Sequence, residues 1–380
     1  MNYTQQVKLL VKSNSYNEEI LKDEVTNNIT SIGAKYFWEQ GYTGKGVVVA
    51  ILDTGCNYNH LDLKDRIIGG YNFTNESDGE VTIFEDLNGH GTHVAGTIAA
   101  SYNNLGIVGV APEVSLLILK VLDYRGSGTV DSLVKAIEYS INWTGPNKER
   151  VNILSLSLGL SISKESLHNA IKQAISNNIA VVVASGNEGD GDLSTDEYTY
   201  PAGYEEVIAV GAIDNNNKVA NFTSTNKEVD IYAPGVDIKS TYLNTDYADL
   251  SGTSMAAPHV TGALALLINK YENLIKSKPT ESQLFKYLMQ YTDNVQIGDS
   301  EETISILNLS KDVNIEGDYI KKPEDLLDKS LLFKCFCEAR KSQAFFTQCL
   351  KENSSEYERE FLVSLIQESA STVRQIKNLM

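Results

Sequence analysis

The chain has 380 residues, 42% of them hydrophobic, and a formal net charge of −18 at pH 7. A chain of this size and apolar content can bury a large core, as one large domain or two ordinary ones. Nucleic acid and anionic membranes would repel its negative charge, so we expect no nucleic-acid partner and no membrane partner.

The N-terminal residues show no pattern typical of export. Residues 1–20 are mostly polar, and no later segment approaches the ~18 consecutive apolar residues of a membrane span. The chain has 4 cysteines, and three of them fall within residues 335–349. So few cysteines favour a reducing compartment, and we predict a soluble, cytoplasmic protein with a short N-terminal extension at residues 1–22.

Apolar runs of strand length alternate with helical patterns from residue 47 onward. The predicted strands are residues 47–52, 116–122, 152–158, 180–184 and 207–213, and the predicted helices are residues 93–100, 129–143, 164–177 and 282–291. Because the runs are continuously apolar, both faces of the sheet should be covered. The order predicts an α/β fold with a doubly wound, mostly parallel sheet and helices on both faces, whose site lies beyond the carboxyl ends of the strands.

The composition changes near the C-terminus. Residues 324–380 contain no glycine or proline, and their charged and apolar residues alternate at helical spacing. We predict a linker and helical C-terminal extension over residues 311–380, with two helices broken near residues 353–355. Cys335 and Cys337 are spaced so that a helix would point them to different faces, which favours idle thiols over a zinc site.

Ser254 opens a segment that reads as the start of a buried helix. Small and apolar residues follow it to Leu267, and Pro258 is tolerated only in a first helical turn. Unpaired backbone N–H groups and the positive end of the helix dipole would therefore surround Ser254. On this segment alone, two interpretations stay open: a helix N-cap, or an oxygen nucleophile whose reaction builds up negative charge.

Three motifs occur in a fixed order along the chain. They are Val-Ala-Ile-Leu-Asp-Thr-Gly ending at Gly55, Asn-Gly-His-Gly-Thr-His-Val-Ala-Gly-Thr ending at Thr97, and Gly-Thr-Ser-Met-Ala-Ala-Pro ending at Pro258. Together they resemble the subtilisin family of serine proteases, in its Asp, His, Ser order.

The resemblance assigns roles to one residue in each motif. It implies Ser254 as the nucleophile, His90 as general base and then acid, and Asp53 as the carboxylate that orients the imidazole. A serine hydroxyl needs such a base to attack an amide at neutral pH. We interpret the other histidines of these motifs, His93 and His259, as core residues.

The resemblance also implies an oxyanion hole and a substrate cleft. Asn187, next to two glycines, would donate its side-chain N–H to the oxyanion. The substrate would lie as an extended strand between two glycine-containing segments. The residues expected to bind it are Gly126, Ser127, Gly128, Ser157, Leu158, Gly159, Ala184, Gly186 and Thr199.

Metal binding is a further implication of the resemblance. Carboxylate, amide and carbonyl oxygens are the ligands that calcium takes, and we expect one tight Ca²⁺ site. The residues expected to form it are Asp62, Ser101, Asn103, Leu105, Ile107 and Asp23. Glu228 and Asp230, with carbonyls near Ala202, Tyr204 and Val207, resemble a weaker second cation site.

Within the family, residues 69–74 and 186–192 look closest to the bacterial intracellular subtilisins. Those enzymes carry a short N-terminal extension that blocks the active site through a Leu-Ile-Pro-Tyr-like segment. Here Leu9-Leu10-Val11-Lys12 stands nearest to that pattern, without its proline or tyrosine. Our hypothesis is that residues 1–22 restrain activity and are removed on maturation. Intracellular relatives are often dimers, so a homodimer is a further expectation, with no interface located.

The sequence therefore predicts a calcium-stabilised, intracellular serine endopeptidase acting on protein or peptide substrates through an acyl-enzyme. The peptidase domain would span residues 23–310. One alternative is a catalytically silent regulatory protein, and another is an enzyme that matures a single partner. The presence of Asp53, His90, Ser254 and Asn187 together favours an active enzyme.

Overall fold

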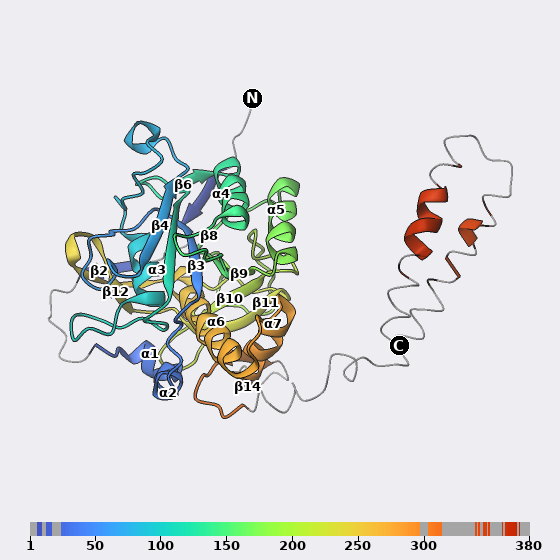
Figure 1. Cartoon of the computed structure of the whole chain (residues 1–380). Coiled ribbons are helices and arrows are strands. Elements are labelled where there is room, and N and C mark those ends of the chain that lie inside the picture. Colours follow the sequence, from blue (N-terminus) through green and yellow to red (C-terminus); the bar gives the residue numbers. More distant parts are fainter. Residues whose placement is uncertain are drawn as a thin grey trace. The chain divides into compact units, whose positions relative to one another are not determined.

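A computed structural model of the chain describes residues 6–9, 13–16, 24–296 and 303–313, and, further on, residues 339, 341–342, 345–347, 349, 359, 362–370 and 372 (Figure 1). The chain divides into two compact units, Met1–Val313 and Asn314–Met380. The described residues of the second unit are helical. The predicted helix break at residues 353–355 and the thiols of Cys335 and Cys337 lie outside the described residues.

A 9-stranded sheet forms the centre of the first unit, in the order β14-β15-β11-β10-β9-β7-β3-β5-β4. Its strands are β3 (Val48–Asp53), β4 (Ile67–Asn72), β5 (Ser115–Lys120), β7 (Ile153–Leu156), β9 (Ala180–Ala184), β10 (Ile208–Ile213), β11 (Val229–Pro234), β14 (Thr292–Gln296) and β15 (Thr303–Leu307). Every pair is parallel except β14 with β15. This confirms the predicted doubly wound, mostly parallel α/β fold.

Successive side chains of a strand point to opposite faces of the sheet. Because the side chains on both faces of β3 are apolar, helices cover both faces. In β3, Val49 and Ile51 pack in one apolar cluster with α3 (His90–Ala99) and α6 (Thr253–Ile275). Val48 and Ala50 pack in a second cluster with α4 (Val130–Asn142) and α5 (Glu165–Ser176). The helices α1 (Asn27–Ser31), α2 (Ala34–Glu39) and α7 (Glu281–Gln290) add residues to the first cluster.

Two small sheets contain the N-terminal segment, for which the sequence predicted no strand. In one, β1 (Gln6–Leu9) lies between β6 (Ser127–Thr129) and β8 (Leu158–Gly159). In the other, β2 (Ser13–Tyr16) extends the pair β12 (Ile238–Thr241) and β13 (Tyr247–Ser251). Short 3-10 helices at Glu76–Gly79 and Leu243–Thr245 complete the described elements of this unit.

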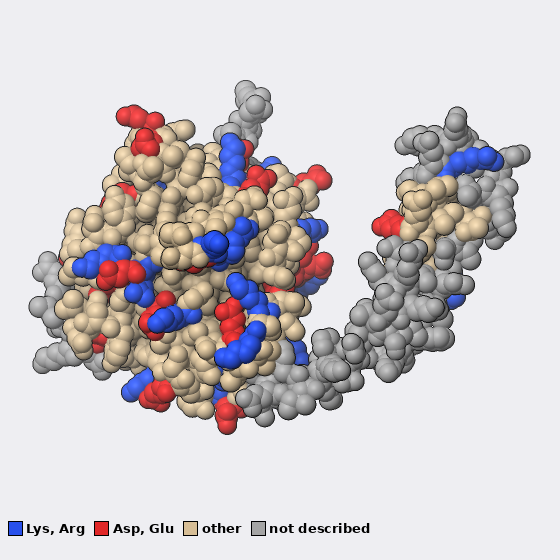
Figure 2. Space-filling model, viewed as in Figure 1, with Lys and Arg blue, Asp and Glu red and all other residues tan. Residues whose placement is uncertain are grey.

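One face of the first unit carries side chains of both signs of charge. On the face shown in Figure 2, acidic and basic side chains are interspersed rather than gathered by sign. In the described part of the chain, no helix combines the length and apolarity needed to cross a bilayer.

Candidate active site

The three sequence motifs converge beyond the carboxyl ends of the central strands. Asp53 is the last residue of β3, His90 is the first residue of α3, and Ser254 lies in the first turn of α6. Gly89, just before α3, has a φ of 101°, a left-handed conformation that suits glycine and turns the chain into the helix. The fold therefore brings together residues that are far apart in sequence.

Asp53 and His90 form a buried contact. His90 Nδ1 lies 2.7 Å from Asp53 Oδ1, and the two residues are 2% and 1% exposed. The same carboxylate oxygen accepts a 2.7 Å hydrogen bond from the Thr54 amide. Because Nδ1 faces a carboxylate, it holds the imidazole proton and leaves Nε2 free to accept one. His90 Nε2 is buried and has no partner.

Ser254 is fully buried, and its hydroxyl points to a carbonyl rather than to the imidazole. Its Oγ donates to the Ser157 carbonyl oxygen at 2.9 Å, and Ser157 Oγ in turn donates to the Ser254 carbonyl at 3.0 Å. No hydrogen bond joins Ser254 to His90. The hydroxyl would have to be redirected from the Ser157 carbonyl to engage Nε2, and catalytic hydrogen bonds often tighten only with substrate bound.

Asn187 is oriented by the helix that carries Ser254. Its Oδ1 accepts two hydrogen bonds from Thr253, from the amide at 3.0 Å and from the hydroxyl at 3.0 Å. With the oxygen fixed in this way, Nδ2 is the free end of the amide group, and it is buried without a partner. A buried donor without a partner is costly unless a ligand completes it.

His93 and His259 are both core residues, as interpreted from the sequence. His93 Nε2 lies 2.9 Å and 3.0 Å from the carbonyls of Ile238 and Ala248, and burial lowers its pKa to about 3. His259 Nδ1 donates to the Met255 carbonyl at 2.8 Å, while its Nε2 lies 2.8 Å from Asn28 Nδ2. Burial lowers the His259 pKa to about 4, so both rings are neutral at pH 7.

The expected substrate-binding residues fall on two groups of segments. Gly126, Ser127 and Gly128 lie at or beside β6, and Leu158 and Gly159 form β8. In the second group, Ala184 ends β9 and leads to Gly186. Thr199 lies against this segment: its hydroxyl donates to the Ser185 carbonyl at 2.6 Å, and a Cβ on Gly186 would lie 2.6 Å from its methyl group.

The N-terminal strand β1 lies between β6 and β8, which are the expected walls of the substrate cleft. It pairs antiparallel with both walls: Val7 lies opposite Gly128, and Leu9 lies opposite Leu158. The Leu9 amide donates to the Gly126 carbonyl at 3.2 Å, and Val7 is only 1% exposed. Antiparallel pairing between two strand edges is the mode by which an extended peptide is held by backbone hydrogen bonds. Of the predicted Leu9-to-Lys12 segment, only Leu9 is among the described residues.

The residues expected to bind calcium also come together, beside the loop that follows α3. The Asp62 carboxylate is buried and accepts hydrogen bonds from Asn103 Nδ2 at 3.1 Å, the Ile107 amide at 3.3 Å and the Tyr247 hydroxyl at 2.8 Å. The Ser101 amide donates to the Asp62 carbonyl at 2.9 Å. The loop between these residues contains Leu105, whose amide donates to Asn103 Oδ1 at 2.9 Å.

Glu24 belongs to this group, although the sequence analysis proposed its neighbour Asp23, which lies outside the described residues. Glu24 is 8% exposed, and its Oε1 accepts a 3.2 Å hydrogen bond from the Asn103 amide. Its Oε2 is buried without a partner. Burial is the main cause that raises the Glu24 pKa, and the charge of Asp62 adds to it. The backbone of Glu24 is also fixed, because the Val108 amide donates to its carbonyl at 3.0 Å.

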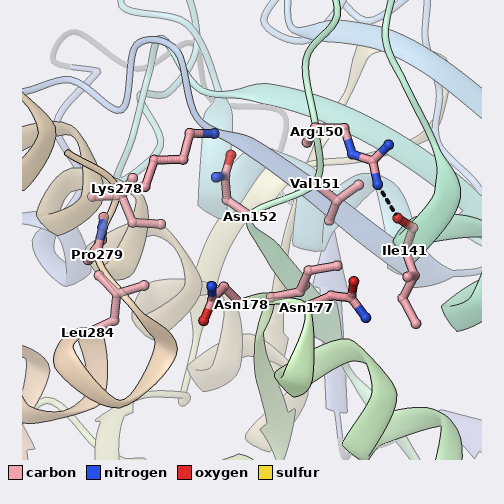
Figure 3. A pocket seen from close by; sticks show the side chains of 11 residues that line it. Ile141, Arg150, Val151, Asn152, Asn177, Asn178, Lys278, Pro279 and Leu284 are labelled. Carbon is pink, nitrogen blue, oxygen red and sulfur yellow. Dashed lines mark hydrogen bonds between the residues drawn. The ribbon is translucent and has the colours of Figure 1, made fainter. Parts of the chain in front are cut away.

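One of the cavities in the described part of the chain adjoins β1. A cavity of about 600 Å³ begins beside Gln6 of β1 and is bounded by β6 and by Glu76 and Asp123. A smaller one, of about 260 Å³, is lined by residues before β7 and β9, including Arg150, Asn152 and Asn178 (Figure 3). It lies at the amino ends of the strands, opposite to the three motifs, and contains none of the predicted site residues.

Comparison with known proteins identifies the family. The family model described as the subtilase family matches residues 44–303. The chain is 48% identical over 278 residues to the major intracellular serine protease of Bacillus subtilis (strain 168), covering 73% of this chain and 85% of that protein. It is 48% identical over 278 residues to an intracellular serine protease of Paenibacillus polymyxa, covering 73% of this chain and 82% of that protein. It is 43% identical over 254 residues to subtilisin DY of Bacillus licheniformis, covering 67% of this chain and 88% of that protein. The chain belongs to the subtilase family and is a subtilisin-like serine endopeptidase that acts on protein or peptide substrates.

Proposed function

We propose that Asp53, His90 and Ser254 form the catalytic triad of this endopeptidase. The observation that carries the proposal is the buried 2.7 Å contact between Asp53 Oδ1 and His90 Nδ1, which leaves Nε2 unpartnered. Nε2 would take the proton of Ser254 as its oxygen attacks the scissile carbonyl. The bond to the leaving amine then breaks, the amine takes this proton from His90, and an acyl-Ser254 ester forms. Water then attacks the ester as His90 takes its proton, and His90 gives that proton to the Ser254 oxygen as the ester bond breaks, which releases the acid product.

Asn187 is the proposed oxyanion donor of this reaction. Thr253 holds the carbonyl end of its amide, so Nδ2 is left to donate where negative charge develops. The donor is already buried and oriented before substrate arrives, which avoids reorganisation during the reaction. The backbone N–H of Ser254, in the first turn of α6, is the proposed second donor.

Substrate would take the place of β1. The non-primed part of a peptide would pair antiparallel with β6 and β8, as Gln6 to Leu9 do in this chain. Its side chains would alternate between the cleft floor and solvent, as the buried Val7 and the exposed Lys8 alternate. The wall formed by Ser157, Ala184, Gly186 and Thr199 is the proposed primary side-chain pocket.

It follows that residues 1–22 would restrain the enzyme until they are removed. A strand that occupies both edges of the cleft excludes substrate, and its attachment to the same chain gives it a high effective concentration. The pairing of β1 and the burial of Val7 support this proposal. Residues 1–22, 23–310 and 311–380 are accordingly the proposed extension, peptidase domain and C-terminal extension.

Calcium is the proposed metal of the site around Asp62. Two buried carboxylates, Asp62 and Glu24, face the loop of residues 101–107, and one oxygen of Glu24 lacks a partner. A cation that prefers oxygen ligands would bind the unpartnered oxygen of Glu24. It would also offset the repulsion from Asp62 that helps to raise the Glu24 pKa. Asp62, Glu24 and Asn103 would hold it, with carbonyls of Ser101, Leu105 and Ile107. Its contribution would be stability, because bound metal favours the folded chain.

We further propose an intracellular site of action, on the strength of the two relatives named as intracellular serine proteases. A homodimer remains a proposal that rests on resemblance alone. The alternative of a regulatory or maturation-specific protein makes a different prediction for general substrates, since it would leave an unfolded protein uncut.

Casein digestion by the chain tests the proposed function. The parent protein should digest casein, phenylmethylsulfonyl fluoride should stop it, and Ser254→Ala should lack it. Ser163→Ala is a matched serine control, because the Ser163 hydroxyl donates to the Tyr204 hydroxyl and lies outside the three motifs. Digestion by the Ser254→Ala variant at the parent's rate would refute the proposed triad. Cleavage of a single partner but never of casein would favour the maturation-specific alternative.

A further inference from the structure

Asp86 is a buried carboxylate that the proposed reaction does not use. It lies between β4 and α3, shortly before His90, and is 2% exposed. Among the ion pairs found in the described residues, none involves Asp86. Burying a charge costs free energy unless hydrogen bonds compensate it. The hydrogen bonds of this carboxylate therefore indicate its role.

Five donors converge on the two oxygens of Asp86. Oδ1 accepts from the amides of Asn88 and Gly89 and from the Thr54 hydroxyl, each at 2.9 Å. Oδ2 accepts from the Thr92 amide at 2.9 Å and from the Thr92 hydroxyl at 2.6 Å. Both oxygens of an ionised carboxylate accept hydrogen bonds and neither donates. The amide of asparagine or glutamine has only one oxygen, so neither residue can accept from all five donors.

These donors come from the two segments that carry the acid and the base. Asn88, Gly89 and Thr92 belong to the turn and first helical turn around His90. Thr54 follows Asp53 directly, and its amide donates to Asp53 Oδ1 at 2.7 Å. Its hydroxyl donates to Asp86 and accepts from the Gly91 amide at 2.9 Å. Asp86 and Thr54 therefore join the end of β3 to the start of α3.

We propose that Asp86 is a positioning residue that fixes where His90 presents Nε2 to Ser254. The contact with Asp53 holds one side of the imidazole, but the backbone of the first turn of α3 decides where the other side points. The Ser254 hydroxyl donates to the Ser157 carbonyl and must turn from it to reach Nε2. The imidazole must therefore already be held in the position that the hydroxyl will reach. A misplacement of about 1 Å in such a site costs on the order of 10²-fold in rate.

The competing interpretation is a helix cap that contributes stability alone. A cap of that kind would lower the melting temperature when removed and leave the turnover of the folded enzyme unchanged. Thr280 provides the matched control, because its side chain caps α7 through a capping box that is remote from the three motifs. Thr280→Ala should lower the melting temperature and leave kcat unchanged.

The test compares Asp86→Asn, Thr54→Val and Thr54→Ser with the parent and with Thr280→Ala. All are full chains with the same N-terminus, checked by mass spectrometry. kcat, KM and the inactivation rate by phenylmethylsulfonyl fluoride are measured below the melting temperature. Asp86→Asn should lower kcat and the inactivation rate together by about 10²-fold, with KM within about threefold of the parent. Thr54→Val should also lower both rates, and Thr54→Ser, which keeps the hydroxyl, should restore them.

A folded Asp86→Asn enzyme with a parental kcat would overturn the proposal and leave the cap interpretation. If Asp86→Asn does not fold, the Thr54 pair decides, because Thr54→Val leaves the bonds of Asp86 to α3 intact. Parental rates for Thr54→Val would then overturn it. The proposal rests on the proposed triad, and activity in Ser254→Ala would refute that triad independently of any result at Asp86.

Discussion

Replacing Val7 by alanine should raise the initial rate of the intact chain about tenfold. Val7 is 1% exposed and packs in the apolar cluster that contains Leu122 and Leu158. Truncation to alanine removes two methyl groups, each worth about 0.8 kcal/mol, so seating β1 in the cleft becomes about 1.5 kcal/mol less favourable. About 1.4 kcal/mol corresponds to a factor of ten in an equilibrium. If the seated state dominates, activity scales with the small unseated fraction and rises by that factor.

The assay is the initial rate on a short chromogenic peptide, at a substrate concentration well below saturation. Mass spectrometry of each sample establishes that residues 1–22 are still attached. Lys8→Ala is the matched control, because Lys8 pairs with both walls through its backbone while its side chain is exposed. It should change the rate by less than about twofold. Equal rates for Val7→Ala, Lys8→Ala and the parent would refute the reasoning that β1 restrains the enzyme through its buried side chain.

Three further changes test the proposed oxyanion donor, the proposed calcium site and Asp230, a residue of the second cation site expected from the sequence. Asn187→Ala should lower kcat by ~10²–10³ with little change in KM on a peptide substrate, a magnitude known from this family rather than worked out from this structure; an unchanged kcat would exclude Asn187 as a donor. Glu24→Gln should raise the melting temperature of calcium-free protein, because it removes a buried charge, and should shrink the increase that calcium produces; an undiminished calcium effect in thermal scans would contradict its role as a ligand. Burial raises the pKa of Asp230 to about 6 from an ordinary 3.8, so the stability linked to its protonated form is complete below pH 3.8 and lost as pH rises through about 6. Asp230→Asn should therefore gain stability relative to the parent between pH 4 and pH 7 in buffer without divalent cations, by at most about 3 kcal/mol, and a pH-independent difference in chemical denaturation would count against this.

The sequence predicted the five central strands of the sheet, β3, β5, β7, β9 and β10, because they are continuous apolar runs, and it missed β4, β11, β14 and β15. The observed β9 spans Ala180–Ala184, the predicted range, and β3 is shifted by one residue to Val48–Asp53. α3 begins at His90 rather than at the predicted residue 93. The carboxylate of Asp86 and the turn at Gly89 hold this first turn, and neither produces an apolar periodicity.

Two of the missed strands, β1 and β2, depend on partners far along the chain. β1 and β2 are four residues each, and their pairing edges belong to β6, β8 and β13. Such segments form strands because they can pair with the edge of another strand. Their own composition gives little indication of strand structure. β13 alternates buried and partly exposed residues over only Tyr247–Ser251, which is too short a pattern to distinguish from a loop.

The sequence could predict the chemistry of the candidate site but not its contacts. Motif order indicated Asp53 and His90 as partners, and the structure places them 2.7 Å apart. Nothing in the motifs indicated that the Ser254 hydroxyl would face the Ser157 carbonyl. Adjacent acids such as Asp23 and Glu24 are also equivalent in a sequence pattern, and the contacts of Glu24 with Asn103 and Val108 are seen in the structure alone.

Covalent labelling measures most directly whether Ser254 is a nucleophile activated by His90. The chain is treated with phenylmethylsulfonyl fluoride, digested, and searched by mass spectrometry for the sulfonyl group. We expect the label on the peptide that contains Ser254, and no label after the same treatment of the His90→Ala variant. Label on another serine, or equal labelling of Ser254 without His90, would contradict the proposed triad.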